Sequence, residues 1–547
     1  MADQSTIDPK SGFCSQTKTF HSLRPQVPLP PLSASISVAD YAFSLLQSFP
    51  PPPTTAALID AVTGRRISFE EFIRRTKTLS SSLHHRLGLR KGDTAFILSP
   101  NSVDIPILCF SLFSLGVILS TGNPISSKQE IFHQIQLSKP VIAFSTADVA
   151  SKIPNLKTIV LNSPEFESLV TSSTPIGEEL QGASNKVNQS DPAAILYSSG
   201  TTGRVKGVML THRNLTYMVA AGQAVRVERK SPAVSYCAVP FFHVYGLCYF
   251  LRALAMGETV VLMARFDMKI MLRAIEELRI THMALAPPVV VAMVKDPKLI
   301  QGYDLSSLQV VGCGGAPLRK SIIQQFRQRF PDVILGQAYG LTESTARVFG
   351  TLSLSESQVI GATGKLMPNC QAKIVDPKTG LPLPPGSPGE LWIRGPSIMK
   401  GYVDDEEATA AALNTEGWLR TGDLCYIDNE GYLFFMDRIK ELIKYKGYQV
   451  APAELEHLLH SHPDIVEAAV IPYPDEESGQ VPVAFVVRQN GSAIDESQIK
   501  NFIAPQVAPY KRIRRVIFID SLPRNAGGKL LRKELVKLSL SNATSKL

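Results

Sequence analysis

The chain has 547 residues, of which 44% are hydrophobic and 19% charged, and this composition excludes a disordered or fibrous protein. The length exceeds what one hydrophobic core holds, so we expect at least two domains. The 56 Lys and Arg residues outnumber the 48 Asp and Glu residues for a net charge of +8, which is spread along the chain. Without a basic block, the sequence argues against nucleic acid as a partner, and the modest excess is compatible with small polyanions.

Three whole-chain features bear on location. The longest apolar run, residues 105–119, is shorter than the roughly 18 residues of a membrane helix, and we predict a buried helix there and no transmembrane segment. The seven cysteines form no C-x-x-C pair and are expected to be reduced thiols. The chain ends in Ser545-Lys546-Leu547, the tripeptide that a soluble import receptor reads. We therefore expect a peroxisomal protein.

The predicted elements follow one order along the chain. Residues 1–35, rich in Ser, Pro and Thr, are expected to lie extended over the surface. Beyond them, helical periodicity alternates with β-rich runs, which is typical of a layered α/β domain with a parallel sheet. Residues 361–402 carry short strands punctuated by Gly and Pro, as in a β-rich subdomain. We expect strands at 94–98, 141–144, 193–197, 208–210, 259–262 and 308–311, and helices at 68–87, 268–278, 319–329 and 529–538.

A hydroxyl- and glycine-rich segment, residues 197–208, lies between two predicted strands. Glycines allow the backbone to approach a phosphate, and main-chain N–H groups and hydroxyls can donate to its oxygens. Lys206 adds a positive charge. The spacing differs from that of a Walker loop, and a flexible surface loop is the alternative. The groups predicted to hold the phosphates are Ser198, Ser199, Gly200, Thr201, Thr202 and Lys206.

Seven motifs of this chain together resemble the adenylate-forming superfamily, in particular the plant 4-coumarate–CoA ligases and their peroxisomal relatives. Each further motif alone has a simpler interpretation: a core histidine, a glycine-rich turn or a solvated charge. Their order is that of the superfamily, from about residue 10 to the end. The motifs are the segment just described, Pro240-Phe-Phe-His-Val-Tyr-Gly246, Gly314-Gly-Ala-Pro-Leu318, Gln337-Ala-Tyr-Gly-Leu-Thr-Glu343, Gly417-Trp-Leu-Arg-Thr-Gly-Asp423, the charged run from Asp437 to Gln449, and Pro523-Arg-Asn-Ala-Gly-Gly-Lys-Leu530.

The resemblance implies a fold and a division into domains. Residues 36–436 would form a large N-terminal α/β domain of stacked sheets with the β-rich subdomain, which binds ATP and the acyl substrate. Residues 437–547 would form a small mobile C-terminal α+β domain that pivots about Asp437. It also implies an enzyme that uses ATP, magnesium and coenzyme A to convert a carboxylic acid into an acyl-adenylate and then a thioester.

Residue roles follow from the same resemblance. Lys529 would bridge the substrate carboxylate and the α-phosphate, and His243, Lys206 and Thr342 would assist adenylation. Glu343 would hold magnesium. The nucleotide would contact Gln337, Ala338, Tyr339, Thr342, Asp423, Arg438, Lys440, Lys444 and Gln449 besides the phosphate segment and Lys529; the acyl group would contact His243, Tyr245, Ala316, Gly340, Arg347 and Val348; and CoA would contact Arg265, Lys446 and Gly447.

Three departures from the coumarate enzymes concern the ligands. Ala338 replaces their usual Gly, and Arg265 replaces a Lys near CoA. Arg347 and Val348 occupy a stretch that those enzymes line with apolar residues. We expect Arg347 to point to solvent; if it points inward, it would meet a polar or charged group distal to the reacting carboxylate. Hydroxycinnamates, fatty acids and oxylipin precursors of jasmonate all remain open as substrates.

Rival functions share part of this pattern. Luciferase-like oxygenases carry the same motifs and often the same C-terminal tripeptide, and oxygen uptake would distinguish them. A nucleotide-binding protein without turnover is disfavoured because Lys206, His243, Glu343, Asp423 and Lys529 are all present. Loading of a carrier protein is disfavoured because no carrier domain follows Lys529.

Overall fold

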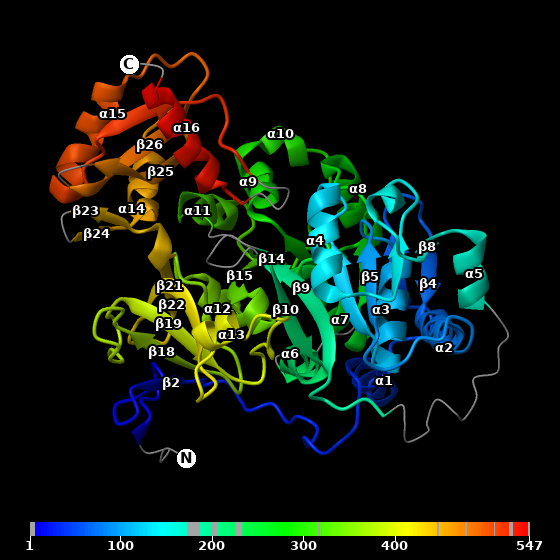
Figure 1. Ribbon diagram of the computed structural model, residues 1–547. Coiled ribbons are helices and arrows are strands. Elements are labelled where there is room, and N and C mark those ends of the chain that lie inside the picture. The colour runs from blue at the N-terminus through cyan, green and yellow to red at the C-terminus, as the bar shows by residue number, and fades with distance from the viewer. Residues whose placement is uncertain are drawn as a thin grey trace.

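The computed structural model describes residues 6–171, 186–198, 205–224, 232–315, 318, 320–445, 448–475, 478–507, 509–524 and 529–544, the last few of them and residues 346, 448 and 449 by their backbone only. Within this part, four β-sheets with flanking helices form a large α/β body and a smaller one (Figure 1). This is the α/β architecture that the sequence predicts.

The first sheet has seven strands, and its core is parallel because β5, β6, β7, β8 and β9 run in one direction. Only β10, which returns from β9, and β20 are antiparallel to their neighbours. In spatial order the strands are β20 (Gly401–Tyr402), β10 (Lys206–Thr211), β9 (Pro192–Ser198), β6 (Ile118–Gly122), β5 (Thr94–Leu98), β7 (Ile142–Ser145) and β8 (Thr158–Val160).

The second sheet has nine strands and is also parallel at its centre, from β15 to β3. At one end the chain turns back on itself, so that β16 is antiparallel to β15. The order is β17 (Lys365–Leu366), β16 (Ala346–Gly350), β15 (Ile334–Leu341), β14 (Val310–Cys313), β13 (His282–Leu285), β11 (Val234–Cys237), β12 (Thr259–Leu262), β3 (Ala56–Asp60) and β4 (Arg66–Ser68).

The third sheet is antiparallel and contains the predicted β-rich region, but its first two strands come from the N-terminal segment. Phe20 is buried and pairs with Ala372. The expectation that residues 1–35 only lie over the surface therefore missed two strands, since strands this short carry no periodicity. The order is β1 (Phe13–Cys14), β2 (Thr19–His21), β18 (Gln371–Val375), β19 (Gly389–Arg394), β21 (Leu419–Ile427) and β22 (Leu433–Arg438).

The fourth sheet forms the smaller body, drawn orange to red in Figure 1. Its long hairpin β25–β26 is covered by α14, α15 and α16, and α16 begins three residues later than predicted. The elements are β23 (Ile443–Tyr445), β24 (Tyr448–Val450), α14 (Pro452–Leu459), β25 (Ile465–Asp475), β26 (Gly479–Arg488), α15 (Glu496–Ile503), η7 (Ala504–Gln506), η8 (Pro509–Lys511), β27 (Arg515–Phe518) and α16 (Arg532–Thr544).

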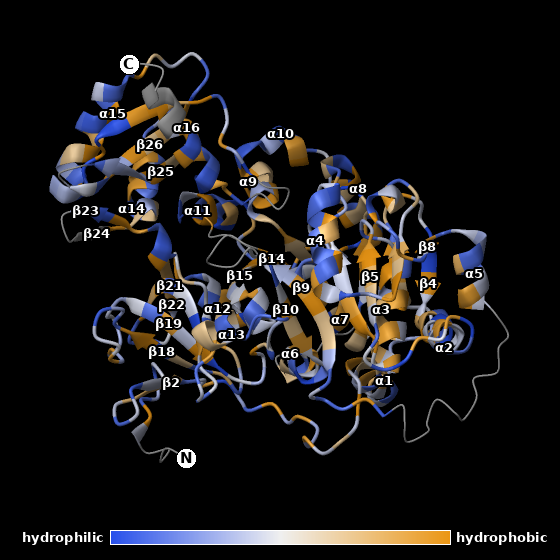
Figure 2. Cartoon of the chain, in the orientation of Figure 1, coloured by the Kyte–Doolittle hydropathy of each residue, from blue (hydrophilic) through white to orange (hydrophobic). Residues whose placement is uncertain are grey.

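Helices cover the first two sheets, and the hydrophobic residues concentrate on the central strands and on α3 (Figure 2). The helices and 3-10 helices that precede β23 are α1 (Val38–Ser48), α2 (Phe69–His85), α3 (Asp104–Leu115), α4 (Lys128–Ser138), η2 (Ala150–Lys152), α5 (Pro164–Thr171), α6 (His212–Ala224), α7 (Val244–Ala255), α8 (Met268–Leu278), α9 (Pro287–Lys295), α10 (Pro297–Ile300), α11 (Lys320–Arg329), η5 (Thr342–Ser344), α12 (Leu354–Ser357), α13 (Glu406–Ala412) and η6 (Ile439–Glu441).

The apolar run 105–119 is mostly the predicted buried helix. Nearly all of α3 is buried, and the helix ends at Gly116, whose φ of 67° is left-handed, before the run enters β6. Among the residues that the structure describes, no helix combines the length and apolarity needed to cross a bilayer. All seven cysteines are free thiols and buried.

Candidate active site

The segment that is predicted to hold the phosphates joins two antiparallel strands. β9 ends at Ser198, which pairs with Lys206 at the start of β10. Residues 199–204 lie outside the described residues, so the predicted contacts of Ser199, Gly200, Thr201 and Thr202 remain predictions. The two described ends hold a hydroxyl and an ammonium group side by side at the end of the hairpin.

Glu343 connects this hairpin to the second sheet. The residue is 8% exposed in η5, and its Oε1 accepts hydrogen bonds from Ser198 Oγ at 2.8 Å and from Tyr402 Oη at 3.0 Å. Lys206 Nζ lies 4.6 Å from the centre of the Tyr402 ring, a cation–π contact. Oε2 receives no hydrogen bond from any residue that the structure describes. Three segments far apart in sequence thus leave one carboxylate oxygen for a ligand.

A single carboxylate suits magnesium in one particular way. Mg²⁺ takes six oxygen ligands and is commonly bound by one or two carboxylates together with substrate phosphates. No group of three or more His, Cys, Asp or Glu side chains in the described part of the chain could hold a metal by itself. Glu343 beside the phosphate segment therefore fits a metal that arrives with the nucleotide.

Tyr339 and Asp423 form a second buried pair. Tyr339 Oη donates to Asp423 Oδ2 at 2.7 Å, and the Tyr339 ring stacks on Phe435 at 6.5 Å. Arg438 pairs with Asp423 across β21 and β22, with Nε 3.4 Å from Oδ1. Oδ1 is buried and has no hydrogen-bond donor in the described part of the chain. An ionised carboxylate with one unfilled acceptor can receive a hydroxyl, as the predicted ribose contact requires.

Burial and the charge of Arg438 have opposite effects on the pKa of the Asp423 carboxyl. Removal from water raises the pKa of this carboxyl above its ordinary value, and the positive charge of Arg438 offsets only part of that rise. Burial also raises the pKa of Tyr339, so the phenol stays protonated and donates. The pair therefore presents a fixed acceptor beside a ring.

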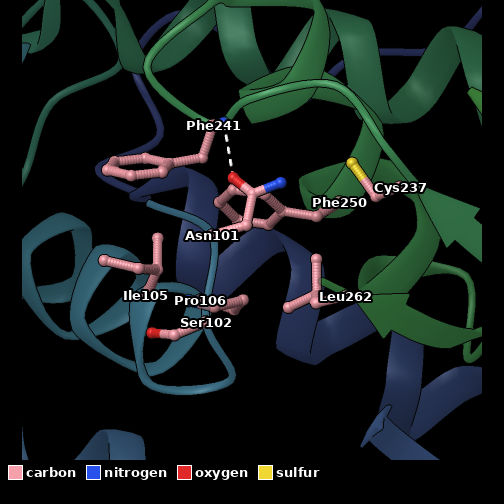
Figure 3. A pocket seen from close by; sticks show the side chains of 8 residues that line it. All are labelled: Asn101, Ser102, Ile105, Pro106, Cys237, Phe241, Phe250 and Leu262. Atoms are coloured by element: carbon pink, nitrogen blue, oxygen red, sulfur yellow. Dashed lines mark hydrogen bonds between the residues drawn. The ribbon is translucent and has the colours of Figure 1, made fainter. Parts of the chain in front are cut away.

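His243 is the N-cap residue of α7, and the loop that precedes it is held in place by Asn101. Asn101 Nδ2 donates to Val239 O at 3.1 Å, and Asn101 Oδ1 accepts from Phe241 N at 2.9 Å; the second bond is the dashed line of Figure 3. Asn101 follows β5 and lines a small apolar pocket with Phe241 and Phe250. This double clamp fixes the loop that presents His243.

Gly246 explains the end of the same motif. A Cβ at this position would lie 2.1 Å from Pro240 O, so only glycine lets the loop fold back on the first turn of α7. The His243 side chain is exposed, yet the surrounding protein lowers its pKa, and the charge of Lys529 lowers it further. A neutral imidazole faces the site.

The acyl motifs meet where α7 passes β14. A Cβ at Gly312 would lie 3.1 Å from Tyr245 Oη, and one at Gly314 would lie 3.4 Å from the Tyr245 ring. Glycines at these positions leave room for the tyrosine. Ala316 lies outside the described residues, and Gly340 is exposed at the end of β15.

Contrary to our expectation, Arg347 does not point to solvent. It is half-buried on β16 opposite Gly340, and burial lowers its pKa to about 10, helped by the charges of Arg252 and Arg24. Val348 is fully buried in the hydrophobic core. Successive side chains of a strand face opposite sides, so these two residues do not line one pocket together. The sequence did not predict the direction of the Arg347 side chain, because β16 has no alternation of polar and apolar residues that would show which of its sides is covered.

Lys529 of the small domain lies close to these groups. Burial lowers its pKa first and the charge of Arg438 second, whereas Glu441, Asp423 and Glu343 raise it. Although its side chain keeps solvent-exposed surface, charges of both bodies act on it. A bridge between Arg524 and Leu530 closes the base of its loop, and Arg532 ties α16 to Glu441 at 2.9 Å. The far end of the chain therefore lies near Glu343 and Asp423.

Asp437 ties the two bodies at the predicted pivot. Its Oδ1 accepts from Arg438 N at 2.7 Å and its Oδ2 from Ala453 N, in the first turn of α14, at 2.9 Å. Burial raises the Asp437 pKa to about 6. Lys440 and Lys444 are exposed just beyond it. Lys446, Gly447 and the side chain of Gln449 fall outside the described residues.

The remaining predicted residues lie around β15. Gln337 Nε2 donates to Ala362 O at 3.1 Å, and Ala338 and Thr342 are half-buried on the same run. Arg265 is exposed in the loop before α8, and nothing in the structure links it to the groups above.

Two residues that organise the site were not predicted. Tyr402 stands in no motif, and only the antiparallel contact of β20 with β10 brings it beside Glu343. The presence of Asn101 at the site could have been predicted, because polar residues that follow a parallel strand gather at the ligand edge of the sheet.

Comparisons with known proteins agree with this architecture. The AMP-binding enzyme family matches residues 48–403, and the C-terminal domain of AMP-binding enzymes matches residues 454–529. The 4-coumarate–CoA ligase-like 9 protein of Arabidopsis thaliana is 47% identical over 100% of this chain and 99% of its own length. Peroxisomal OPC-8:0-CoA ligase 1 of the same plant is 45% identical over 98% and 99%.

A solved structure shares the fold. The o-succinylbenzoate coenzyme A synthetase MenE of Bacillus subtilis, in complex with ATP and a magnesium ion, aligns with a TM-score of 0.77 and 28% identity over 91% of this chain and 99% of MenE. The fold and these matches define an adenylate-forming enzyme. The chain belongs to the AMP-binding enzyme family, and within it is an AMP-forming acid–CoA ligase that resembles the 4-coumarate–CoA ligases.

Proposed function

We propose that this enzyme activates a carboxylic acid at the groups around Glu343 and Lys529, and then passes the acyl group to CoA at the same site. The single observation that carries the proposal is the approach of Lys529 to Glu343, Asp423 and His243, which come from three other motifs. These are the groups that a phosphate, a ribose and a carboxylate would need within one site.

In the first step a carboxylate oxygen of the acid attacks the α-phosphorus of ATP, and the bond to the bridging oxygen breaks to release pyrophosphate. Negative charge grows on the phosphate oxygens, and Lys206, Thr342 and Lys529 stabilise it. Neutral His243 orients the attacking carboxylate without neutralising it.

Magnesium would bind the free Oε2 side of Glu343 and, when bound, would neutralise phosphate charge. The support is the buried Glu343 carboxylate beside Ser198 and the magnesium ion named with ATP in the MenE complex. Ser198 and Tyr402 hold the carboxylate in place before the nucleotide arrives.

In the second step the small domain rotates about Asp437, withdraws Lys529 and presents Lys446 and Gly447 to CoA. The CoA thiol loses its proton, its sulfur attacks the acyl carbonyl carbon, and AMP leaves. The Asp437 side chain accepts one hydrogen bond from Arg438 N within β22 and one from Ala453 N of α14, so the second bond links the third sheet to the smaller body at the proposed pivot.

We infer that the acyl substrate is a hydroxycinnamate, a fatty acid or an oxylipin precursor of jasmonate, the classes suggested by the relatives that the chain resembles, one of them named an OPC-8:0-CoA ligase. Location in the peroxisome is supported by the same relative and by Ser545-Lys546-Leu547. A fluorescent protein fused to the N-terminus should enter peroxisomes, and removal of the tripeptide should leave it in the cytosol because the import receptor loses its recognition element.

The deciding experiment measures pyrophosphate release with aromatic, medium-chain, long-chain and cyclopentanone-bearing acids, with and without CoA. We expect at least one acid to release pyrophosphate and to yield acyl-CoA and AMP when CoA is added. If no acid releases pyrophosphate, or if oxygen is consumed in place of CoA, the proposal fails.

A further inference from the structure

The acyl side of the site contains a guanidinium and a phenol that the protein does not satisfy. Arg347 comes from β16 and Tyr245 from the first turn of α7, which packs against β16. Neither the Arg347 guanidinium nor the Tyr245 hydroxyl forms a hydrogen bond or ion pair with the residues that the structure describes, although the two groups are close enough for each to influence the pKa of the other. The Arg347 guanidinium and the Tyr245 hydroxyl are therefore both available to bind a ligand.

The charges around Arg347 are already balanced, which leaves its own charge unmatched. Arg252 pairs with Glu258 at 3.3 Å, and Arg24 pairs with Glu356 at 2.9 Å. The Tyr217 hydroxyl, which also faces Arg347, donates to Pro368 O at 2.6 Å. With a pKa of about 10 the guanidinium stays protonated at neutral pH. The groups that act most strongly on Arg347 are thus two arginines and two phenols, and no carboxylate of the described residues forms an ion pair with it.

An uncompensated charge in a half-buried position costs stability, and a hydrocarbon side chain of similar volume would avoid that cost. A ligand that supplies an acceptor would offset it, because a guanidinium presents several donors in a fixed fork. The same group would be poorly matched to an all-hydrocarbon acyl chain, which would desolvate it without pairing it.

The direction of the Arg347 side chain is defined by a glycine. A Cβ at Gly350 would lie 2.5 Å from Arg347 Cδ and 3.2 Å from Nε, so the side chain runs along β16 over Gly350. Gly350 itself pairs with Ala338 of β15. The absence of a side chain at position 350 leaves the space that the Arg347 side chain occupies.

The same arrangement places Arg347 away from the reacting end. His243 caps α7, and Tyr245, Tyr249 and Arg252 follow on one face of that helix at spacings of four and three residues. With a rise of about 1.5 Å per residue, Tyr245 lies about 3 Å and Arg252 about 13 Å along the axis from His243. Because β16 packs against α7 and Arg347 lies close enough to Tyr245 and Arg252 to interact electrostatically with both, it lies along this path rather than beside His243.

We propose that Arg347, assisted by the Tyr245 hydroxyl, determines substrate specificity by binding an acceptor oxygen at the end of the acyl substrate remote from the reacting carboxylate. The substrate class is then an acid with a distal ketone, hydroxyl or second carboxylate, in preference to an unsubstituted acid of the same length. This inference rests on the proposed adenylation of a carboxylic acid and adds what its far end must carry.

The test compares matched acids in the intact enzyme. The kcat/KM for pyrophosphate release is measured for an unsubstituted medium-chain acid and for acids of equal length with a distal ketone or a second carboxylate. We expect the wild type to prefer an acceptor-bearing acid. Arg347→Met should lower the ratio of acceptor-bearing to unsubstituted kcat/KM by about 10- to 100-fold, since a hydrogen bond to a charged group is lost. Arg347→Lys should restore part of that ratio, because it keeps the charge without the fork.

A second variant tests position rather than chemistry. Gly350→Ala places a methyl group against Arg347 Cδ and should displace the guanidinium. It should lower the same ratio in the wild type and change it little in the Arg347→Met background. If the wild type shows no preference, or if the ratio survives Arg347→Met, the inference is overturned while adenylation stands. Failure to adenylate any acid instead overturns the proposed function.

Discussion

The two ends of the site differ in how the protein treats its polar groups. At the nucleotide end, Glu343 and Asp423 each accept a hydrogen bond from a tyrosine and keep one oxygen open. At the acyl end, Arg347 and the Tyr245 hydroxyl lack such partners in the described part of the chain. A group that meets the same ligand in every turnover can be oriented in advance, as electrostatic preorganisation requires.

This difference separates reaction class from substrate choice. The paired groups are those that motif resemblance also identifies, because ATP imposes one geometry on them. Of the unpaired groups, Arg347 on β16 stands where the sequence departs from the coumarate enzymes, whereas Tyr245 on α7 belongs to a shared motif. We propose that the acid supplies the partner of both. In this proposal the nucleotide end defines the chemistry and the acyl end selects the molecule.

The largest expected effect concerns Lys529. Lys529→Ala should lower the rate of acyl-adenylate formation by about 100- to 1,000-fold, because a charge-stabilising group is lost from the transition state. Thioester formation from a supplied acyl-adenylate should remain, since the proposed rotation withdraws this lysine. Pyrophosphate release and acyl-CoA formation are measured separately.

Lys533→Ala is the matched control for this variant. It removes an equal charge from the exposed first turn of α16, four residues further on, and should leave both rates nearly unchanged. Equal loss of both half-reactions in Lys529→Ala would contradict the proposed division of labour.

The next effect tests the carboxylate at the hairpin. Glu343→Gln should raise the magnesium concentration needed for half-maximal adenylation by about 10- to 100-fold, because a charged ligand becomes neutral. Tyr402→Phe removes only one hydrogen bond to Oε1 and should shift the same midpoint by less than about tenfold. A magnesium titration of pyrophosphate release measures the midpoint of both variants. An unchanged midpoint in Glu343→Gln would show that Glu343 does not bind the metal.

A third experiment tests the ribose contact of Asp423. Asp423→Asn should weaken ATP binding by about tenfold, since the open acceptor loses its charge. The wild type should also bind ATP more tightly than 2′-deoxy-ATP, and the variant should lose most of this discrimination. Binding is measured by titration calorimetry. Equal discrimination in both proteins would mean that Asp423 serves only to orient Tyr339.

The smallest effect is a pH dependence at Asp437. Its folded-state pKa of about 6 exceeds the ordinary value of 3.8, so the folded state binds the proton more tightly than the unfolded state. The stability that this group contributes is full below about pH 4 and is lost as the pH rises through 6. Relative to Asp437→Asn, the wild type should lose free energy of unfolding on the order of 1 kcal/mol across this window.

Chemical denaturation of both proteins from pH 4 to 8 measures that difference. The difference should be constant above about pH 7, where Asp437 is ionised in both the folded and the unfolded state. A difference that is flat from pH 4 to 6 would show that the carboxyl is solvated at the pivot.

Local sequence fixed the elements with strong periodicity. The strands at 94–98 and 259–262 and the helix at 268–278 have the predicted bounds, because their apolar spacing matches one period over the whole element. The strands of the N-terminal segment were missed, since two or three residues carry no period and only pairing with β18 defines them.

The amino-acid sequence by itself determined the reaction class, because a nucleotide demands particular residue types at particular spacings, and these remain readable in a linear chain. Tertiary structure decided which distant groups face one another: Tyr402 with Glu343, Asn101 with the loop of His243, and Arg347 with α7 rather than solvent. Such contacts depend on strand order and on which side of a strand is covered, and neither is encoded in local spacing.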